Sequence, residues 1–180
     1  MKLVLTNDFE LVKSKYLDVI ENTPQMQRYA RWVYGKHPTD ELLQSYIDRG
    51  EMYLLMDGDD VAGMAAISMC QGEDYEPIPC QDDCRNDQVT TVHLLAVVPA
   101  YRGRSLGIRI LEEAMDIAVK NEKKALRLDT LKSNLPAQRM YERAGFSYRG
   151  TQNLYAENTG MTDFLYYEKI PAQTGVHFSG

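Results

Sequence analysis

The sequence contains no hydrophobic stretch that approaches the length needed to cross a bilayer. Its apolar beginning is interrupted by Thr6-Asn7-Asp8 before the core of a secretion signal could form. Basic residues are also in deficit, because 20 Lys and Arg face 26 Asp and Glu, for a net charge of −6. Nucleic acid and anionic membranes would repel such a chain. We therefore expect a cytoplasmic protein without a nucleic-acid or membrane partner.

Cysteine and histidine are scarce, at three residues each. The cysteines lack the paired short spacings of a structural zinc site, and the histidines complete no recognisable set of four ligands. An odd number of cysteines without a secretion signal fits reduced thiols. The residues concerned are Cys70, Cys80, Cys84, His37, His93 and His177. We expect no metal.

The chain of 180 residues, 44% of them hydrophobic, is long enough to bury one continuous core. We expect a single domain over residues 1–180, with a flexible tail at 171–180. Strand patterns at residues 2–5, 51–56, 61–69, 125–130, 146–150 and 162–170 alternate with helical ones. Asn7 or Asp8 and the sequence Pro38-Thr39-Asp40 begin two of these helices. The alternation indicates a mixed α/β fold.

Residues 71–87, QGEDYEPIPCQDDCRND, interrupt this pattern with six acidic residues and one basic residue. The segment is long for a connection between two strands. It is either a functional cover or a mobile decoration. We favour a cover near an acceptor, where its carboxylates would attract a cationic amine.

Residues 92–107, VHLLAVVPAYRGRSLG, join a buried-strand pattern to a proline, an Arg/Gly loop and a helix. Apolar residues at helical spacing predict that helix: Leu106, Ile110, Leu111, Ala114, Ile117 and Ala118. Its start near Ser105 offers unpaired N–H groups and the positive end of the helix dipole, which attract phosphate. Arg102 and Arg104 add charge, and Gly103 and Gly107 permit close approach of the backbone. We predict a site for a phosphorylated ligand.

A second block, NLPAQRMYERAGF at residues 134–146, places Asn134, Ala137 or Gln138, and Tyr141 on one helical face. It resembles the N-x-x-A-x-x-x-Y-x-x-x-G-F helix of the GCN5-related N-acetyltransferase (GNAT) family. The first block, LAVVP followed by RGRSLG, resembles motif A of the same family, usually L-x-V-x-P and then R/Q-x-x-G-x-G/A. Ser105 replaces the usual first glycine, so it is open whether this position needs a positive φ. The serine could instead cap the helix or offer its hydroxyl to phosphate.

The resemblance implies a mostly antiparallel central sheet of about six to seven strands with about four flanking helices. It also implies acetyl-CoA as co-substrate, held by Leu95, Ala96, Val97, Arg102, Gly103, Arg104, Ser105, Leu106, Gly107, Asn134 and Tyr141. Backbone amides of residues 95–97 would hold the acetyl carbonyl and pantetheine arm, and residues 102–107 the pyrophosphate.

Transfer of an acetyl group to an amine needs a base for the amine and an acid for the departing thiolate. The resemblance assigns the acid to Tyr141, since a phenol stays protonated at neutral pH. His93 is a candidate base, and two-residue alternation places it on the strand face of Leu95 and Val97. The sequence His93-Leu94-Leu95-Ala96-Val97 is similar to the H-x-x-A-V strand of arylalkylamine acetyltransferases. Alternatively, His93 is a histidine of the core, and a carboxylate that acts through a water molecule is the base.

We expect a small-molecule or peptide amine as acceptor, bound by Tyr29, Trp32 and Tyr34, although a hydrophobic core would use the same aromatics. A homodimer is left open. A non-catalytic acyl-CoA-binding regulator on the same fold is the alternative function. A P-loop hydrolase is disfavoured, because residues 102–107 lack the G-x-x-x-x-G-K-[ST] frame.

Overall fold

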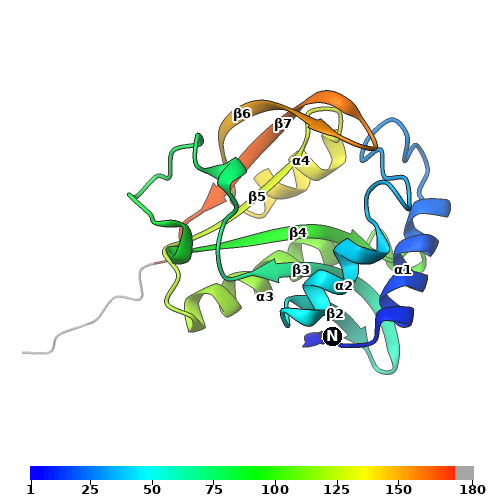
Figure 1. Ribbon diagram of the computed structural model, residues 1–180. Helices are drawn as coiled ribbons and strands as arrows, with labels where there is room; N and C mark the ends of the chain where they lie inside the picture. The colour runs from blue at the N-terminus through cyan, green and yellow to red at the C-terminus, as the bar shows by residue number, and fades with distance from the viewer. Residues whose placement is uncertain (173–180) are drawn as a thin grey trace, which may run out of the picture.

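The computed structural model describes residues 1–172, which form one seven-stranded sheet covered by four α-helices (Figure 1). The strands are β1 (Lys2–Leu5), β2 (Met52–Asp57), β3 (Asp60–Ser68), β4 (Val89–Val97), β5 (Ala125–Leu131), β6 (Ser147–Ala156) and β7 (Gly160–Lys169). The helices are α1 (Phe9–Glu21), α2 (Asp40–Asp48), α3 (Leu106–Lys120) and α4 (Leu135–Arg143). Most of segment 171–180, expected as a tail, lies outside the described residues.

The strand order is β1-β2-β3-β4-β5-β7-β6, and β4 with β5 is the parallel pair of this sheet as described. The other neighbouring strands pair antiparallel. This confirms the mixed, mostly antiparallel architecture expected above. No helix within residues 1–172 combines the length and apolar character needed to span a membrane.

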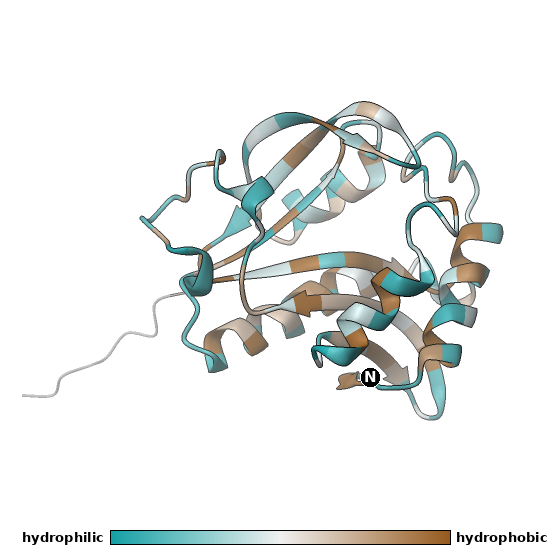
Figure 2. Ribbon diagram, viewed as in Figure 1, coloured by the Kyte–Doolittle hydropathy of each residue, from teal (hydrophilic) through white to brown (hydrophobic). Residues whose placement is uncertain are grey.

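Two apolar layers sandwich the central strands. Helices α1 and α2 pack on one face through residues such as Val12, Tyr16 and Leu43. Helix α3 packs on the other face through residues such as Ile110 and Leu111. Figure 2 shows the apolar residues gathered on the central strands, whereas segment 71–87 is largely hydrophilic. The helices therefore hold the sheet rigidly from both sides.

The helix starts follow the predicted caps. The Asp8 side chain accepts a hydrogen bond from the backbone N–H of Leu11 at 3.0 Å, and Thr39 accepts one from Leu42 at 3.1 Å. Each cap satisfies a donor that the first helical turn leaves without a partner. The aromatic stretch at residues 25–34 forms turns and no α-helix.

Strand β4 carries a bulge at Leu94, which adopts a left-handed φ of 53°. On β3, Met64 and Ala66 share one face of the sheet, and their partners on β4 are Ala96 and His93. One extra residue therefore separates His93 from Ala96, and simple alternation breaks there. The prediction that His93 shares the strand face of Leu95 and Val97 is wrong: His93 lies on the face of Ala96.

Beyond Val92, β4 and β5 separate. Their parallel pairing runs from Val89 opposite Ala125 to Val92 opposite Leu128. Strand β5 then continues along β7, while β4 remains beside β3, and Figure 1 shows the two halves of the sheet diverging. One edge of β4 is thereby left without a strand partner. Side chains from both faces of the sheet can reach the space between the halves.

Segment 71–87 is anchored to the sheet. Arg127 on β5 is fully buried and donates to the Gln71 side chain and the Ile78 carbonyl, both at 2.8 Å. The buried Tyr75 hydroxyl donates to Asp129 at 2.6 Å. These contacts attach the segment to β5, and its role as a cover near an acceptor stays a prediction.

Candidate active site

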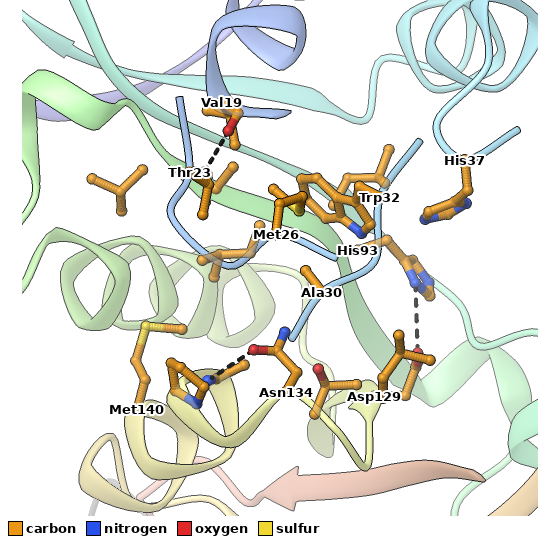
Figure 3. Close-up of a pocket in the computed structure, with 18 of the residues that line it drawn as sticks. Val19, Thr23, Met26, Ala30, Trp32, His37, His93, Asp129, Asn134 and Met140 are labelled. Carbon is orange, nitrogen blue, oxygen red and sulfur yellow. Dashed lines mark hydrogen bonds and ion pairs between the residues drawn. The ribbon is translucent and has the colours of Figure 1, made fainter. Parts of the chain in front are cut away.

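A cavity of about 590 Å³ occupies the space where β4 and β5 separate (Figure 3). Its walls come from the end of α1, the connection after it, β4, β5 and α4. The predicted residues in its lining are His93, Leu95, Ala96, Val97, Arg102, Gly103, Asn134, Tyr141 and Trp32. Residues from both sequence blocks therefore meet around one space, although 31 or more positions separate them along the chain.

The start of α3 lies at one end of the β4 wall. Ser105 is its N-cap, as predicted, but has φ 57° and ψ 23°, which is left-handed backbone. Its side chain makes no capping hydrogen bond. The backbone thus keeps the positive φ that glycine favours, and the Cβ of serine makes this conformation sterically unfavourable. Of the roles left open for Ser105, the helix-capping hydrogen bond is not formed.

Arg102 lines the cavity, but its guanidinium reaches across to the end of α1. One nitrogen donates to the Asn22 carbonyl at 3.2 Å and another to the Thr23 hydroxyl. Burial lowers the pKa of this guanidinium, which remains charged at neutral pH. Arg102 therefore ties the loop before α3 to the end of α1 and places positive charge at this end of the cavity.

Four of the predicted loop residues do not line this cavity. Arg104, Ser105 and Leu106 border a separate hollow along the outer side of α3, and Arg104 lies over the Tyr101 ring at 5.2 Å. At Gly107, an added Cβ would lie 2.2 Å from Met140 Sδ. Gly107 therefore allows the first turn of α3 to approach α4 closely, and the contact it permits is with a side chain.

Helix α4 brings Asn134 and Tyr141 to the cavity together. Asn134 is the N-cap, and its side-chain oxygen accepts from the Ala137 N–H at 3.4 Å (Figure 3). Tyr141 is buried, and its ring meets Tyr167 edge-on at 5.6 Å. Burial, with the nearby Asp129 charge, raises the pKa of the Tyr141 phenol well above its usual value. The Tyr141 phenol is therefore protonated at neutral pH, and its ring also packs in the core.

At the opposite end, His93 faces a carboxylate from the neighbouring strand. His93 Nδ1 lies 3.9 Å from Asp129 Oδ1, and the same oxygen accepts from Tyr75 (Figure 3). The His93 ring stacks on Tyr46 at 6.1 Å and meets Tyr75 edge-on at 6.2 Å. Burial raises the pKa of Tyr46 to about 12. His93 is therefore held among aromatic rings with an acidic neighbour.

The three predicted acceptor residues separate in space. Trp32 lines the cavity, where its ring meets His37 at 6.2 Å. Tyr34 donates a hydrogen bond to Asp40, and Tyr29 stacks with Arg28. Neither tyrosine lines the cavity. Burial lowers the pKa of His37 and favours its neutral form.

Sequence reasoning missed Asp129, His37 and Tyr46. Asp129 lies in a strand whose other residues are largely buried, and a polar residue in such a strand is a usable signal. Tyr46 lies in the helix that the sequence Pro38-Thr39-Asp40 begins, and His37 is considered above only as a possible metal ligand. No periodicity in the sequence distinguishes a cavity wall from a core.

Known proteins resemble this chain in sequence and in fold. The sequence matches the Acetyltransferase (GNAT) family over residues 19–146. A Bacillus subtilis protein, whose proposed activity is N-acetylation of an alanine of ribosomal protein bS18, is 33% identical over 72 residues, which is 39% of this chain. A Mycobacterium leprae protein of unassigned function is 36% identical over 74 residues, or 41% of this chain. These matches span 46% and 20% of the two relatives, so the chain covers less than half of either.

Solved structures share the fold over nearly the whole chain. A Bacillus subtilis acetyltransferase in complex with CoA superposes with a TM-score of 0.64 at 14% identity, covering 94% of this chain and 97% of the other. A ribosomal-protein-alanine N-acetyltransferase from Brucella melitensis gives 0.68 at 18% identity, covering 94% and 99%. With the family match extending over most of the sequence, this chain belongs to the acetyltransferase (GNAT) family.

Proposed function

We propose that this protein transfers the acetyl group of acetyl-CoA to a primary amine by direct attack, without a covalent enzyme intermediate. The observation that carries the proposal is that one cavity joins a histidine facing a carboxylate, a buried phenol and a loop that begins a helix. A base, an acid and an anion-binding end thus have access to the same space.

The free edge of β4 supports the binding of acetyl-CoA. Beyond Val92 its backbone groups face the cavity side without a strand partner, so an extended pantetheine arm can pair with Leu95–Val97 as an added strand would. The start of α3 and Arg102 supply positive charge for the pyrophosphate. Asn134 borders the same wall from α4. When bound, acetyl-CoA supplies the activated acetyl thioester.

His93 is the proposed base. An amine is charged at neutral pH and must lose a proton before it attacks, and a histidine accepts protons in this range. Asp129, at 3.9 Å from Nδ1, stabilises the charged imidazole that results. A water molecule relaying the proton to Asp129 is the alternative path through the same pair.

Tyr141 is the proposed acid for the departing thiolate. Its raised pKa keeps the phenol protonated, and it lines the cavity beside Ala137 and Asn134. Both similar alanine N-acetyltransferases make an amine at a protein N-terminus one candidate acceptor, and a small-molecule amine is the other.

Replacement of Tyr141 by Phe tests the proposal. We expect kcat to fall about tenfold to a thousandfold while the Kd for acetyl-CoA changes little, because the lost proton is needed mainly in the transition state. Steady-state kinetics and calorimetric binding provide the two values. The matched control is Tyr155→Phe, since Tyr155 is 64% exposed and outside the cavity.

Equal activity of Tyr141→Phe and wild type would remove Tyr141 as the acid. Tight CoA binding without any acetylated product from a broad amine panel would replace the enzyme by an acyl-CoA-binding regulator.

A further inference from the structure

The cavity has an uneven distribution of charge. Among its described lining residues, Arg102 and Asp129 are the two with charged side chains. Arg102 is bound to the end of α1, whereas Asp129 lies on β5 beside His93. Figure 3 shows Thr23, the partner of Arg102, and Asp129 on opposite sides of the cavity. The end that contains the proposed base therefore has a negative charge and no lysine or arginine among the lining residues described.

The carboxylate of Asp129 creates a local negative field at this end of the cavity. An amine acceptor enters as a cation, and this field attracts it.

The walls around Asp129 are apolar and aromatic. Trp32, Tyr46 and Phe164 line this part of the cavity together with His37. Aromatic faces attract cations and bury hydrocarbon. A group that carries one positive charge on an apolar body fits both features.

Nearby cations are engaged elsewhere. Arg31 donates to the Thr159 carbonyl at 3.2 Å, and Asn158 donates to the Arg31 carbonyl at 2.8 Å, which joins the connection after α1 to the β6–β7 turn. Lys132 pairs with Asp163 at 3.0 Å. Neither cation belongs to the cavity lining. A carboxylate on the acceptor would therefore find no lysine or arginine among the described lining residues of this end, and Asp129 would repel it.

We infer that the acceptor is a small, singly charged amine with an apolar body and no carboxylate or phosphate beside its reacting nitrogen. Asp129 is the residue that selects the charge, and the aromatic walls select the body. The inference rests on the proposed acetyl transfer and adds the chemical class of the acceptor. It excludes free α-amino acids as good substrates.

Three compounds that differ in one group test the inference: 2-phenylethylamine, phenylalaninamide and phenylalanine. The amide fills the space of the carboxylate without its charge, and so separates repulsion from size. We expect kcat/KM for phenylalanine to be lower than for both of the others by about tenfold or more. Quantification of acetylated product by mass spectrometry gives the rates.

A change of the cavity wall tests the electrostatic cause. Ala156, at the end of β6, lines the cavity, and Ala156→Lys would give a carboxylate a partner. We expect this variant to reduce the preference for 2-phenylethylamine over phenylalanine by about tenfold. The matched control Ala156→Met adds similar bulk without charge and should leave the preference in place.

The possible outcomes distinguish a failure of this inference from a failure of the proposed acetyl transfer. Acetylation of phenylalanine as fast as of 2-phenylethylamine, with product formed from both, overturns the inference and leaves acetyl transfer standing. An equal loss for phenylalanine and phenylalaninamide also overturns it, because size would then be the cause. Absence of acetylated product from every amine, with CoA still bound, overturns the proposed function itself.

Discussion

Ser105 shows how a single residue can satisfy a motif while departing from it. The position requires left-handed backbone, and serine adopts φ 57° there without a capping bond to compensate. The side chain therefore contributes little to the start of α3, and the backbone conformation is what the loop retains. Gly103 in the same loop also has a positive φ, 78°, which glycine adopts without a steric cost.

Two substitutions at Ser105 separate side chain from backbone. We expect Ser105→Gly to raise the free energy of unfolding by up to about 1 kcal/mol, because glycine adopts this conformation without the steric cost of a Cβ. Ser105→Ala should change it by less than the roughly 1 kcal/mol typical of a lost cap. Urea unfolding measures both. Asp8→Ala is the control, since Asp8 makes a true capping bond and its loss should destabilise the protein. A large loss in Ser105→Ala would show a side-chain role that the structure does not contain.

His93 permits a test of the base at the same scale. We expect His93→Gln to lower kcat/KM and to flatten the acidic limb of its pH profile, because protonation of the base causes that limb. His37→Gln is the matched control: burial lowers the pKa of His37 and favours its neutral form, so its loss should leave the limb in place. An unchanged limb in His93→Gln would transfer the role to Asp129 acting through water.

At the scale of elements, the bulge in β4 and the separation of β5 create the site. Without the extra residue at Leu94, alternation would place His93 with Leu95 on the α3 side of the sheet. With it, His93 stacks on Tyr46 of α2 and faces Asp129. A local change of one residue thus determines which side chains His93 contacts.

Segment 71–87 depends on a buried ion pair. Arg127 Nε lies 3.1 Å from Glu168 Oε2, with the two side chains 0% and 1% exposed. Arg127 also holds Gln71 and Ile78, and Glu168 accepts from the Gln81 N–H at 2.7 Å. A charge removed from such a pair leaves the other without its partner in a medium of low polarity.

We therefore expect Arg127→Met to lower the free energy of unfolding by about 3–5 kcal/mol. The double variant Arg127→Met with Glu168→Leu should lose less, because no isolated buried charge remains. Arg149→Met is the control, since Arg149 is 25% exposed and 3.7 Å from Glu168, and its loss should be small. Chemical denaturation measures all three. A double variant less stable than Arg127→Met would contradict this account of the pair.

The whole molecule brings the binding groups together across the chain. The end of α1, the loop before α3, the free edge of β4 and α4 all border one cavity. A ligand that contacts these parts binds the folded state alone and stabilises it by mass action.

We expect CoA at about a hundredfold excess over its Kd to stabilise the protein by about 2.7 kcal/mol, a rise in Tm of roughly 5–10 °C. ATP at the same concentration should give no comparable shift, because the chain lacks the P-loop frame and its lysine. Thermal unfolding measured by calorimetry checks both. An equal shift with ATP would indicate general phosphate binding and would count against a pantetheine site on β4.

The sequence alone determined the family, the order of strands and helices, a cap at Asn7 or Asp8, a helix start at Pro38-Thr39-Asp40, and the positions of Asn134 and Tyr141 on one helix face. These features depend on short-range rules, namely hydrophobic period, turn chemistry and motif spacing, which a linear sequence contains. The tertiary structure decided that His93 meets Asp129, that Trp32 lines the cavity while Tyr29 and Tyr34 do not, and that Arg102 binds the end of α1. Those outcomes depend on a bulge, on strand separation and on contacts between distant residues, and none of these has a local signature in the chain.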